Sequence, residues 1–388
     1  MTQKVYLGDI CDIRIGRTPP RKQPQWFSSS HGMKWVSIKD MGNTGKYISQ
    51  TSESLTMDAI SKFNIPIIPE GTLLMSFKLT VGRLGFTEYD MCSNEAIAQL
   101  PIKDPDIVDK NYLYYYLKNF NFDSLSSTSS IATAVNSKTV KNIPIDLPPL
   151  DQQRKIADIL SSLDEKIELN RRMNKTLEQL GQALFRHYFV DNPEVNSWES
   201  GEVSNVIRIY SGFAFKSKDF DINGKYGLVT IKNVQDGCFI KDCTDHLSEP
   251  LPDRIPEYVH LKSGDIILSL TGNVGRVCIV VGRDYLLNQR VAKLVSDESQ
   301  AYAYFLFRSR AMKDRMVGMS KGTAQKNLSP IETGKLKIKI PPTNVMNQFE
   351  ENAIELLNMI VSNNEQIQTL TSLRYSLLPK LISGEIEV

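Results

Sequence analysis

The residue types and spacings that catalysis requires are scarce in this chain. No G-x-x-x-x-G-K-[S/T] phosphate loop occurs, so nucleotide hydrolysis is not expected. An adenine methyltransferase would carry Asn or Asp directly before a Pro-Pro pair and an aromatic residue after it. The two Pro-Pro pairs here stand in Leu147-Pro148-Pro149-Leu150 and Ile340-Pro341-Pro342-Thr343 instead. No carboxylate pair with acid–base spacing is recognisable. We therefore expect a protein that binds rather than reacts.

Basic residues offer binding chemistry instead. The chain carries 46 Lys or Arg against 44 Asp or Glu, a net charge of +2, so the overall balance favours no particular partner. Residues 308–339, however, hold nine basic residues against Asp314 and Glu332. A segment of that sign can meet phosphates, although a solvated face is the commoner meaning of such a run.

The length of 388 residues predicts two or three domains rather than one core. Hydrophobic residues make up 41% of the chain, which is enough to fold. No apolar run reaches the ~18 residues of a membrane-spanning helix, and the first residues lack the apolar core of a secretory signal. Five scattered cysteines suit reduced thiols. We expect a cytoplasmic protein that makes no membrane contact.

The chain is a tandem repeat. Identical residues recur 193 positions apart along most of the sequence. The matching pairs are Gly8/Gly201, Val36/Val229, Ile38-Lys39/Ile231-Lys232, Gly71/Gly264, Ser76/Ser269, Val81-Gly82-Arg83/Val274-Gly275-Arg276 and Pro148-Pro149/Pro341-Pro342. Chance does not hold one register for that long, so we expect two copies of one structural unit, related by a pseudo-twofold axis.

Each copy has two unlike parts. The part before the Pro-Pro pair alternates short β-rich runs with turn residues, as in Trp35–Ile38 and Gly71–Phe77. Short helices such as Tyr112–Leu117 and Tyr302–Phe307 intervene, and we expect their aromatic residues in the core. These patterns predict a mixed α/β (α+β) globule in each copy.

After each Pro-Pro pair the sequence predicts a long helix, because proline ends the preceding strand and permits a helix to begin just beyond it. Apolar residues then recur at alternating steps of four and three, which is typical of a coiled-coil seam. The seams are Ile156, Leu160, Leu163, Ile167, Asn170, Asn174, Leu177, Gly181, Leu184, Tyr188 and Phe349, Ala353, Leu356, Ile360, Asn363, Ile367, Leu370, Arg374, Leu377, Leu381. Two such seams most simply pack on each other as antiparallel helices, each about 60 Å long for about 40 residues.

Asn170 and Asn363 hold the same seam position near the middle of the two helices. A buried seam asparagine weakens packing but fixes the register, because a shifted helix would leave its amide unpaired. We predict that the two side chains face each other and lock the register. The alternative is a pair of solvent-facing asparagines on a frayed seam.

A zinc site is the one metal centre that the sequence suggests. Cys238, Cys243, His246 and His260 have ligand types that zinc prefers. The corresponding stretch of the first copy, 45–67, contains no Cys or His and must fold without metal. We therefore expect no metal in this chain.

Two segments resemble a known family. Leu147–Ile167 closely resembles the central spacer of the specificity subunits of type I restriction-modification systems, and the ending Leu377–Ile386 is equally typical of them. The resemblance extends over essentially the whole chain. It implies target-recognition domains at 1–147 and 191–340 and spacer helices at 148–190 and 341–388.

The resemblance also implies a function. Such a subunit is not an enzyme: each of its domains reads one half of a bipartite site in double-stranded DNA. Its helices dock two methylation subunits, and motor-nuclease (restriction) subunits join the complex. S-adenosylmethionine, ATP and Mg²⁺ belong to those partners, so no cofactor is expected in this chain.

The repeat sorts the candidate DNA contacts. Residues identical in both domains cannot by themselves distinguish two unlike half-sites, so the shared basic residues are expected to serve the fold or the phosphates. These phosphate candidates are Lys39, Arg83, Lys232 and Arg276. Unmatched polar loop residues are the base-reading candidates, because Asn and Gln suit adenine and Arg suits guanine. They are Asn288, Gln289, Arg290, Lys321, Gln325 and Lys326.

Two other functions remain open at this point. One domain could carry an unrecognised methyltransferase or nuclease site, because a site assembled from distant residues escapes a search of spacings. The two globules could instead form a scaffold that binds proteins and leaves DNA to others.

Overall fold

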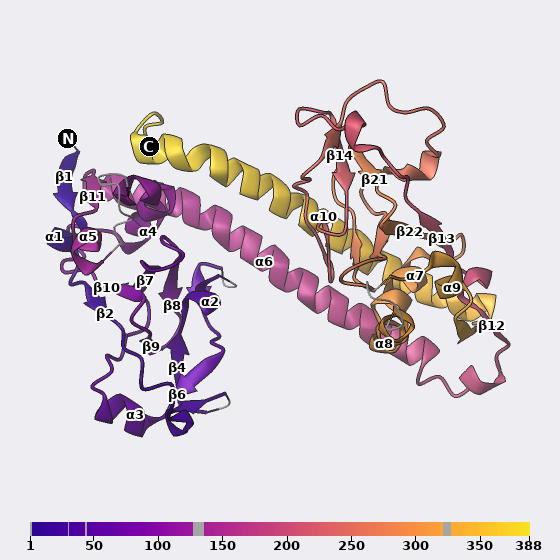
Figure 1. Cartoon of the computed structure of the whole chain (residues 1–388), viewed down its shortest axis with the longest axis horizontal. Coiled ribbons are helices and arrows are strands. Elements are labelled where there is room, and N and C mark those ends of the chain that lie inside the picture. Colours follow the sequence, from indigo (N-terminus) through magenta and orange to yellow (C-terminus); the bar gives the residue numbers. More distant parts are fainter. Residues whose placement is uncertain (1, 30, 43–44, 127–135, 321–326) are drawn as a thin grey trace. The chain divides into compact units, whose positions relative to one another are not determined.

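A computed structural model describes residues 2–29, 31–42, 45–126, 136–320 and 327–388 of the chain (Figure 1). The chain divides into two compact units. Unit 1 comprises Met1–Glu168 and Leu370–Val388, and unit 2 comprises Leu169–Thr369. Within the described ranges, none of the helices combines the length and the apolar character that crossing a bilayer requires. Both units are mixed α/β, and the predicted fold class is confirmed.

Among the residues that the structure describes, unit 1 contains three sheets and several short helices. Its five-stranded sheet has the order β2-β10-β7-β8-β5, its four-stranded sheet β3-β6-β4-β9, and its two-stranded sheet β1-β11. The strands are β1 (Gln3–Tyr6), β2 (Arg14–Ile15), β3 (Phe27–Ser28), β4 (Met33–Val36), β5 (Tyr47–Ile48), β6 (Glu53–Leu55), β7 (Leu73–Ser76), β8 (Leu84–Thr87), β9 (Cys92–Ser93), β10 (Ile97–Leu100) and β11 (Pro144–Leu147). The helices are α1 (Leu7–Ile10), α2 (Ile38–Met41), α3 (Met57–Lys62), α4 (Lys110–Asn119) and α5 (Ser137–Lys141), with 3₁₀ turns η1 (Pro24–Trp26) and η2 (Phe122–Ser126).

The described part of unit 2 contains two four-stranded sheets, β13-β22-β19-β20 and β17-β14-β21-β18, and the strand pairs β12-β23 and β15-β16. The strands are β12 (Ser200–Glu202), β13 (Arg208–Ser211), β14 (Tyr226–Val229), β15 (Val234–Gln235), β16 (Cys238–Phe239), β17 (His246–Leu247), β18 (His260–Leu261), β19 (Ile266–Ser269), β20 (Val277–Ile279), β21 (Tyr285–Leu287), β22 (Val291–Val295) and β23 (Lys337–Lys339). The helices are α7 (Gln300–Arg308), α8 (Arg310–Met319) and α9 (Pro330–Gly334), with 3₁₀ turns η3 (Val195–Ser197), η4 (Val203–Asn205), η5 (Ser217–Asp219) and η6 (Glu257–Val259).

The sequence repeat is also a repeat of topology. The order β2-β10-β7-β8 in unit 1 corresponds to β13-β22-β19-β20 in unit 2, and β6-β4-β9 corresponds to β17-β14-β21. In both units the middle strand of the second set pairs antiparallel with one neighbour and parallel with the other. The same strand connections therefore build both units, as the offset of 193 residues predicts.

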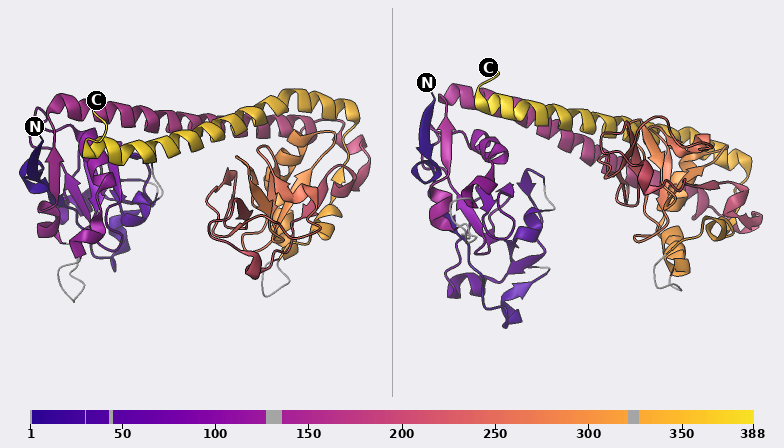
Figure 2. Two further views of the ribbon diagram at one scale, coloured as in Figure 1. Left: turned by 90° about the horizontal axis from the view of Figure 1, so that it is seen from above. Right: turned by 45° about the horizontal axis from the view of Figure 1, so that its top comes forward.

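Two long helices, α6 (Leu150–Phe189) and α10 (Thr343–Ser383), each contribute to both units and pack together (Figures 1 and 2). Their pairing is antiparallel within unit 2, since Asn170 contacts Gln366 whereas Phe185, further along α6, contacts the earlier Phe349. Every residue of the two predicted seams is buried or half-buried. The predicted helices and their apolar seams are thus confirmed.

A buried glutamine in the first turn of α6 ties the start of this helix to the chain that precedes α4. The amide of Gln153 donates to the carbonyls of Pro148 at 2.8 Å and Ile107 at 3.0 Å. Its carbonyl accepts from the backbone of Asp109 at 2.9 Å, directly before α4. One side chain therefore joins the starts of α4 and α6.

The aromatic residues of α4 and α7 lie in the cores. All side chains from Tyr112 to Leu117 and from Ala301 to Phe307 are buried. In unit 2, Tyr302 joins Phe185, Phe189 and Phe349 in an aromatic cluster between α7 and the two long helices. The sequence-based placement of these residues in the core, rather than against a ligand, is confirmed.

Candidate nucleic-acid interface

In unit 1, the hairpin β7–β8 places the first shared arginine. The hydroxyl of Ser76, at the end of β7, donates to the carbonyl of Thr80 and accepts from the backbone N–H of Arg83 at 3.0 Å. Gly82 has φ 86°, a conformation that glycine adopts without strain. Because Ser76 is buried, its two hydrogen bonds satisfy backbone groups that water does not reach.

In unit 2, the hairpin β19–β20 repeats this turn bond for bond. The hydroxyl of Ser269 donates to the carbonyl of Asn273 and accepts from the backbone N–H of Arg276 at 3.1 Å. Gly275 has φ 80°. The residues that the two copies share in this motif are therefore those that the turn requires, and the arginine is delivered to the same place on each hairpin.

The side chain of Arg83 is directed back onto its own domain. Its Nη1 donates to the carbonyl of Ile38, at the start of α2, at 2.7 Å. The guanidinium lies over Gly42, where an added Cβ would stand 2.3 Å from Nη1. Arg83 therefore has a structural partner, which the sequence alone left undecided.

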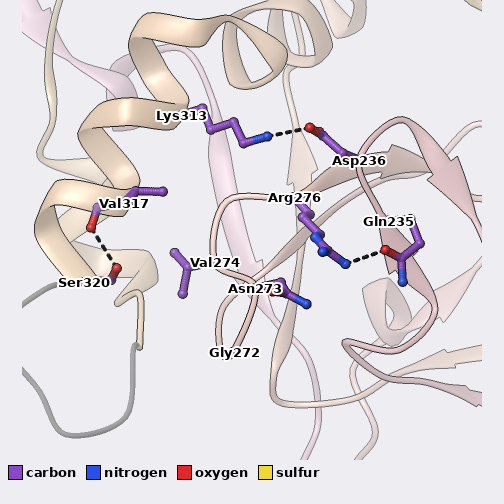
Figure 3. Close-up of a pocket in the computed structure, with 9 residues that line it drawn as sticks. All are labelled: Gln235, Asp236, Gly272, Asn273, Val274, Arg276, Lys313, Val317 and Ser320. Carbon is purple, nitrogen blue, oxygen red and sulfur yellow. Dashed lines mark hydrogen bonds and ion pairs between the residues drawn. The ribbon is translucent and has the colours of Figure 1, made fainter. Parts of the chain in front are cut away.

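Arg276 has a different setting (Figure 3). Its Nη1 donates to the amide oxygen of Gln235, and the amide oxygen of Asn273, turned toward the guanidinium, accepts from Nη1 and Nη2 at 3.2 Å each. The guanidinium lines a hollow of about 360 Å³. The residues around it are Gln235, Asp236, Gly272, Asn273, Val274, Arg276, Lys313, Val317 and Ser320.

The acidic residue of the hollow is already neutralised. Asp236 pairs with Lys313 and with Arg308, and Arg308 also binds Glu178 on α6 at 2.9 Å. Burial alone would lower the pKa of Arg308, but Tyr304, Glu178 and Asp236 raise it above its ordinary value. The ion pairs of Arg308 with Asp236 and Glu178 therefore link the lining of the hollow to the long helix α6 of unit 2.

The shared lysines and the base-reading candidates lie in different surroundings. Lys39 and Lys232 are both exposed. Gln289 and Arg290 are also exposed, whereas Asn288 is buried and its side-chain oxygen accepts from the backbone of Arg290 at 3.2 Å. Asn288 therefore shapes the loop. The remaining candidates, Lys321, Gln325 and Lys326, lie outside the described residues.

The seam asparagines occupy an amide cluster in unit 2 but do not bind each other. Asn170 donates to Gln366 at 3.2 Å, and Asn363 donates to Asn174 at 2.9 Å. Asn174 in turn donates to Asn364 at 2.9 Å. The predicted face-to-face pair was wrong, because the antiparallel register puts Asn170 opposite Gln366. Both side chains are nevertheless buried, so a frayed, solvent-facing seam is also wrong.

Unit 1 has its own buried ionic contact on the long helices. Asp164 on α6 pairs with Arg374 on α10, and its carboxylate also accepts from the hydroxyl of Tyr115 on α4 at 2.8 Å. Burial alone would raise the pKa of Asp164, but Lys118, Arg374 and the Tyr115 hydroxyl hold it below its ordinary value. This contact ties α4 of the globular part to both helices.

The cysteines and histidines of the zinc hypothesis do not converge. His246 and His260 lie on β17 and β18, the two outer strands of one four-stranded sheet, and Cys243 accepts from the amide of Asn233 at 3.5 Å. Across the described parts of the chain, no three His, Cys, Asp or Glu side chains gather closely enough to hold a metal ion.

Two other cysteines, Cys11 and Cys92, are buried, and burial raises the pKa of their thiols to about 12.

Gln235 and Asn273 are the site residues that the sequence analysis missed. Both line the hollow and hold the guanidinium of Arg276. A signal was present in the sequence, since both differ from their counterparts Gly42 and Thr80 at the offset of 193 residues, and Asn273 stands directly before the shared Val274-Gly275-Arg276.

Comparison with known proteins shows which family this chain resembles. The sequence model of the family described as "Type I restriction modification DNA specificity domain" matches residues 2–179 and 196–361. The MjaIX specificity subunit of a type I restriction enzyme from Methanocaldococcus jannaschii is 27% identical, over 98% of this chain and 93% of its own length. The MjaVIII specificity subunit of the same organism is 28% identical, over 99% of this chain and 92% of its own length.

A solved structure shares the fold. The S subunit of a type I restriction-modification system from M. genitalium superposes with a TM-score of 0.61 at 16% identity. The match covers 98% of this chain and 96% of that one. At that identity the likeness concerns the fold alone, and it extends over both units.

Proposed function

From the premise that this chain belongs to the type I restriction-modification DNA specificity family, we propose that each of its two globular parts recognises one half of a bipartite DNA sequence. The chain is the non-catalytic subunit that recognises the DNA target of such a system. The observation that carries the proposal is the repeated topology with unlike surfaces. Two copies of one fold present different side chains, here Gln235 and Asn273 against Gly42 and Thr80.

The two long helices would set the distance between the half-sites. Helices of 40 and 41 residues extend about 60 Å at about 1.5 Å per residue. Two readers related by a pseudo-twofold axis meet one face of the duplex when their half-sites lie about one helical turn apart, roughly 34 Å. Because the copies differ in sequence, the half-sites are expected to differ.

The shared basic residues would bind backbone phosphates and so position each domain on the duplex, and unmatched polar residues would read the bases. The exposed Lys39 and Lys232 and the hairpin arginine Arg276 are the remaining phosphate candidates, since Arg83 is bound to the carbonyl of Ile38. Gln289 and Arg290 are the described base-reading candidates whose side chains are exposed.

The long helices would also dock two methylation subunits, which bind S-adenosylmethionine, and motor-nuclease subunits that use ATP and Mg²⁺ would join them. Leu180 on α6 and Leu373 on α10 support two equivalent docking sites. They occupy the same repeat position, and both are large apolar side chains that remain 48% and 43% exposed. Repeated exposed apolar residues suit two copies of one partner.

The test is to assemble the full-length chain with methylation subunits and to map methylated adenines on DNA of random sequence. We expect one asymmetric, two-part sequence with a spacer of constant length. Methylation at a single contiguous sequence, or at random adenines, would contradict the proposal. Methylation in the absence of the partner subunits would instead reveal an enzyme.

Lengthening both helices is expected to change the spacer alone. Four residues, about one helical turn, can be inserted after Glu168 in α6 and after Thr369 in α10, where the two units meet along the chain. The added rise of roughly 6 Å corresponds to one or two base pairs at about 3.4 Å each. The same mapping experiment would reveal the change, and altered half-sites would contradict the role of the helices as a ruler.

A further inference from the structure

The two shared arginines, Arg83 and Arg276, lie on equivalent backbone structures. Each lies at the same place on a hairpin whose turn is closed by a buried serine. The turns that follow β4 in unit 1 and β14 in unit 2 are also closed in the same way. The backbone N–H of Ser37 donates to Asp40 at 2.9 Å, and that of Thr230 donates to Asn233 at 2.9 Å. A difference between the arginines must therefore come from the residues around them.

One such residue stands two positions beyond the turn that follows β4 or β14. In unit 1 it is Gly42, and the guanidinium of Arg83 occupies the space where a side chain would begin. In unit 2 it is Gln235, whose side chain fills that region and accepts from Arg276. The nitrogen of the same side-chain amide is used as well, since Nε2 of Gln235 donates to the carbonyl of Lys232 at 3.3 Å. Gln235 is thus anchored on its own turn and holds the arginine away from the backbone.

The charge of Arg276 is not cancelled in this position. Its partners Gln235 and Asn273 are neutral amides, and the ion pairs found among the described residues do not involve Arg276. Asp236, which also lines the hollow, is engaged by Arg308 and Lys313. A guanidinium that is oriented by neutral groups and borders a hollow retains its charge for an anion.

The hollow also offers further donors. Lys313 lines the hollow with a side chain that is 38% exposed. The amide nitrogen of Asn273 is directed away from the guanidinium when its oxygen faces Arg276. Ser320 also lines the hollow, but its hydroxyl donates to the carbonyl of Val317 at 2.8 Å (Figure 3). Arginine, lysine and amide donors around one space form a suitable receptor for a phosphate group.

We propose that the hollow of unit 2 binds one backbone phosphate of the DNA duplex through Arg276, and that Gln235 is the positioning residue that makes this arginine available. Arg83 makes no such contact, because Gly42 lets it fold onto the carbonyl of Ile38. The two units therefore make different phosphate contacts with DNA, although both carry the arginine. The inference rests on the proposed function and adds a ligand and a site to it.

The experiment measures the salt dependence of duplex binding by the full-length chain assembled with methylation subunits. Each phosphate contact contributes about 0.9 to the slope of log affinity against log salt. Arg276→Gln is expected to lower that slope by about one unit, equally for target and random duplexes. Gln235→Gly is expected to do the same, since the released guanidinium can fold back as Arg83 does. Arg83→Gln is the matched control and is expected to leave the slope unchanged.

The outcomes separate the inference from the proposed function. A parent complex that binds no duplex would remove the proposed function. A parent complex that binds, with equal slopes for the parent, Arg276→Gln and Gln235→Gly, would overturn the inference alone. A loss confined to duplexes with guanine at one position would also overturn it, because Arg276 would then read a base. Thermal unfolding of each variant checks that unit 2 remains folded.

Discussion

Replacing Asp164 with alanine is expected to cost about 3–5 kcal/mol of unfolding free energy, because it leaves a buried cation without its partner. Asp164 and Arg374 are only 10% and 12% exposed, and Asp164 also binds Tyr115. Urea unfolding of the full-length chain measures the loss. We expect the two compact units to unfold in separate transitions, with the change confined to the one that reports on unit 1.

A double variant distinguishes the penalty of an unpaired charge from the worth of the pair. Asp164→Leu combined with Arg374→Met replaces both charges with apolar groups and is expected to recover most of the lost stability. Arg310→Ala is the matched control, since its ion pair with Asp314 is 96% and 72% exposed, and no measurable change is expected. A double variant as unstable as Asp164→Ala would contradict this account of the contact.

The same contact has a pH signature. The pKa of Asp164 is held below its ordinary value in the folded chain, so the carboxylate stabilises the fold above the unfolded-state value of about 3.9. That contribution is lost as pH falls through the lower folded-state pKa. The difference in unfolding free energy between the parent and Asp164→Ala should therefore be largest near neutral pH and shrink below about pH 4.

Replacing Arg308 with alanine is the second large effect that we expect, again about 3–5 kcal/mol but in unit 2. Arg308 is 15% exposed and joins Glu178 on α6 to Asp236 beside the hollow. Its loss leaves Glu178, 20% exposed, without its cation, and removes one of the two cations that neutralise Asp236. Urea unfolding and limited proteolysis would both report a weakened attachment of α7 to α6.

This variant should also change DNA binding, and that separates it from Asp164→Ala. With Arg308 absent, Asp236 carries more uncompensated negative charge beside Arg276, so affinity should fall for all duplexes. Restoring neutrality with Asp236→Asn in the same chain should recover affinity more than stability. Equal recovery of both would indicate that Asp236 acts only through the fold.

Most of the architecture was predictable because the chain contains two copies of one unit, which can be aligned with each other. The offset between Ser76 and Ser269, continued to the Pro-Pro pairs, predicts duplicated topology without any knowledge of which strands pair. The seams of α6 and α10 were predictable because helical periodicity depends on neighbours along the chain.

The candidate site was less predictable because it depends on contacts between distant residues. Arg83 and Arg276 occupy equivalent positions in the two copies, yet Arg83 binds the carbonyl of Ile38 and Arg276 binds Gln235. The difference depends on a residue some forty positions earlier, which is glycine in the first copy and glutamine in the second. The mutual pairing of Asn170 and Asn363 failed for a similar reason. Periodicity predicts which face of a helix is buried, whereas the register between two helices depends on every contact along them.

The central claim is that two domains of one chain each read one half of a DNA sequence. The most direct measurement exchanges residues 191–342 for those of a relative and maps the methylated adenines produced with the same methylation subunits. The account predicts that one half of the recognised sequence changes, while the other half and the spacer stay as they were. A hybrid that alters both halves, or neither, would contradict it.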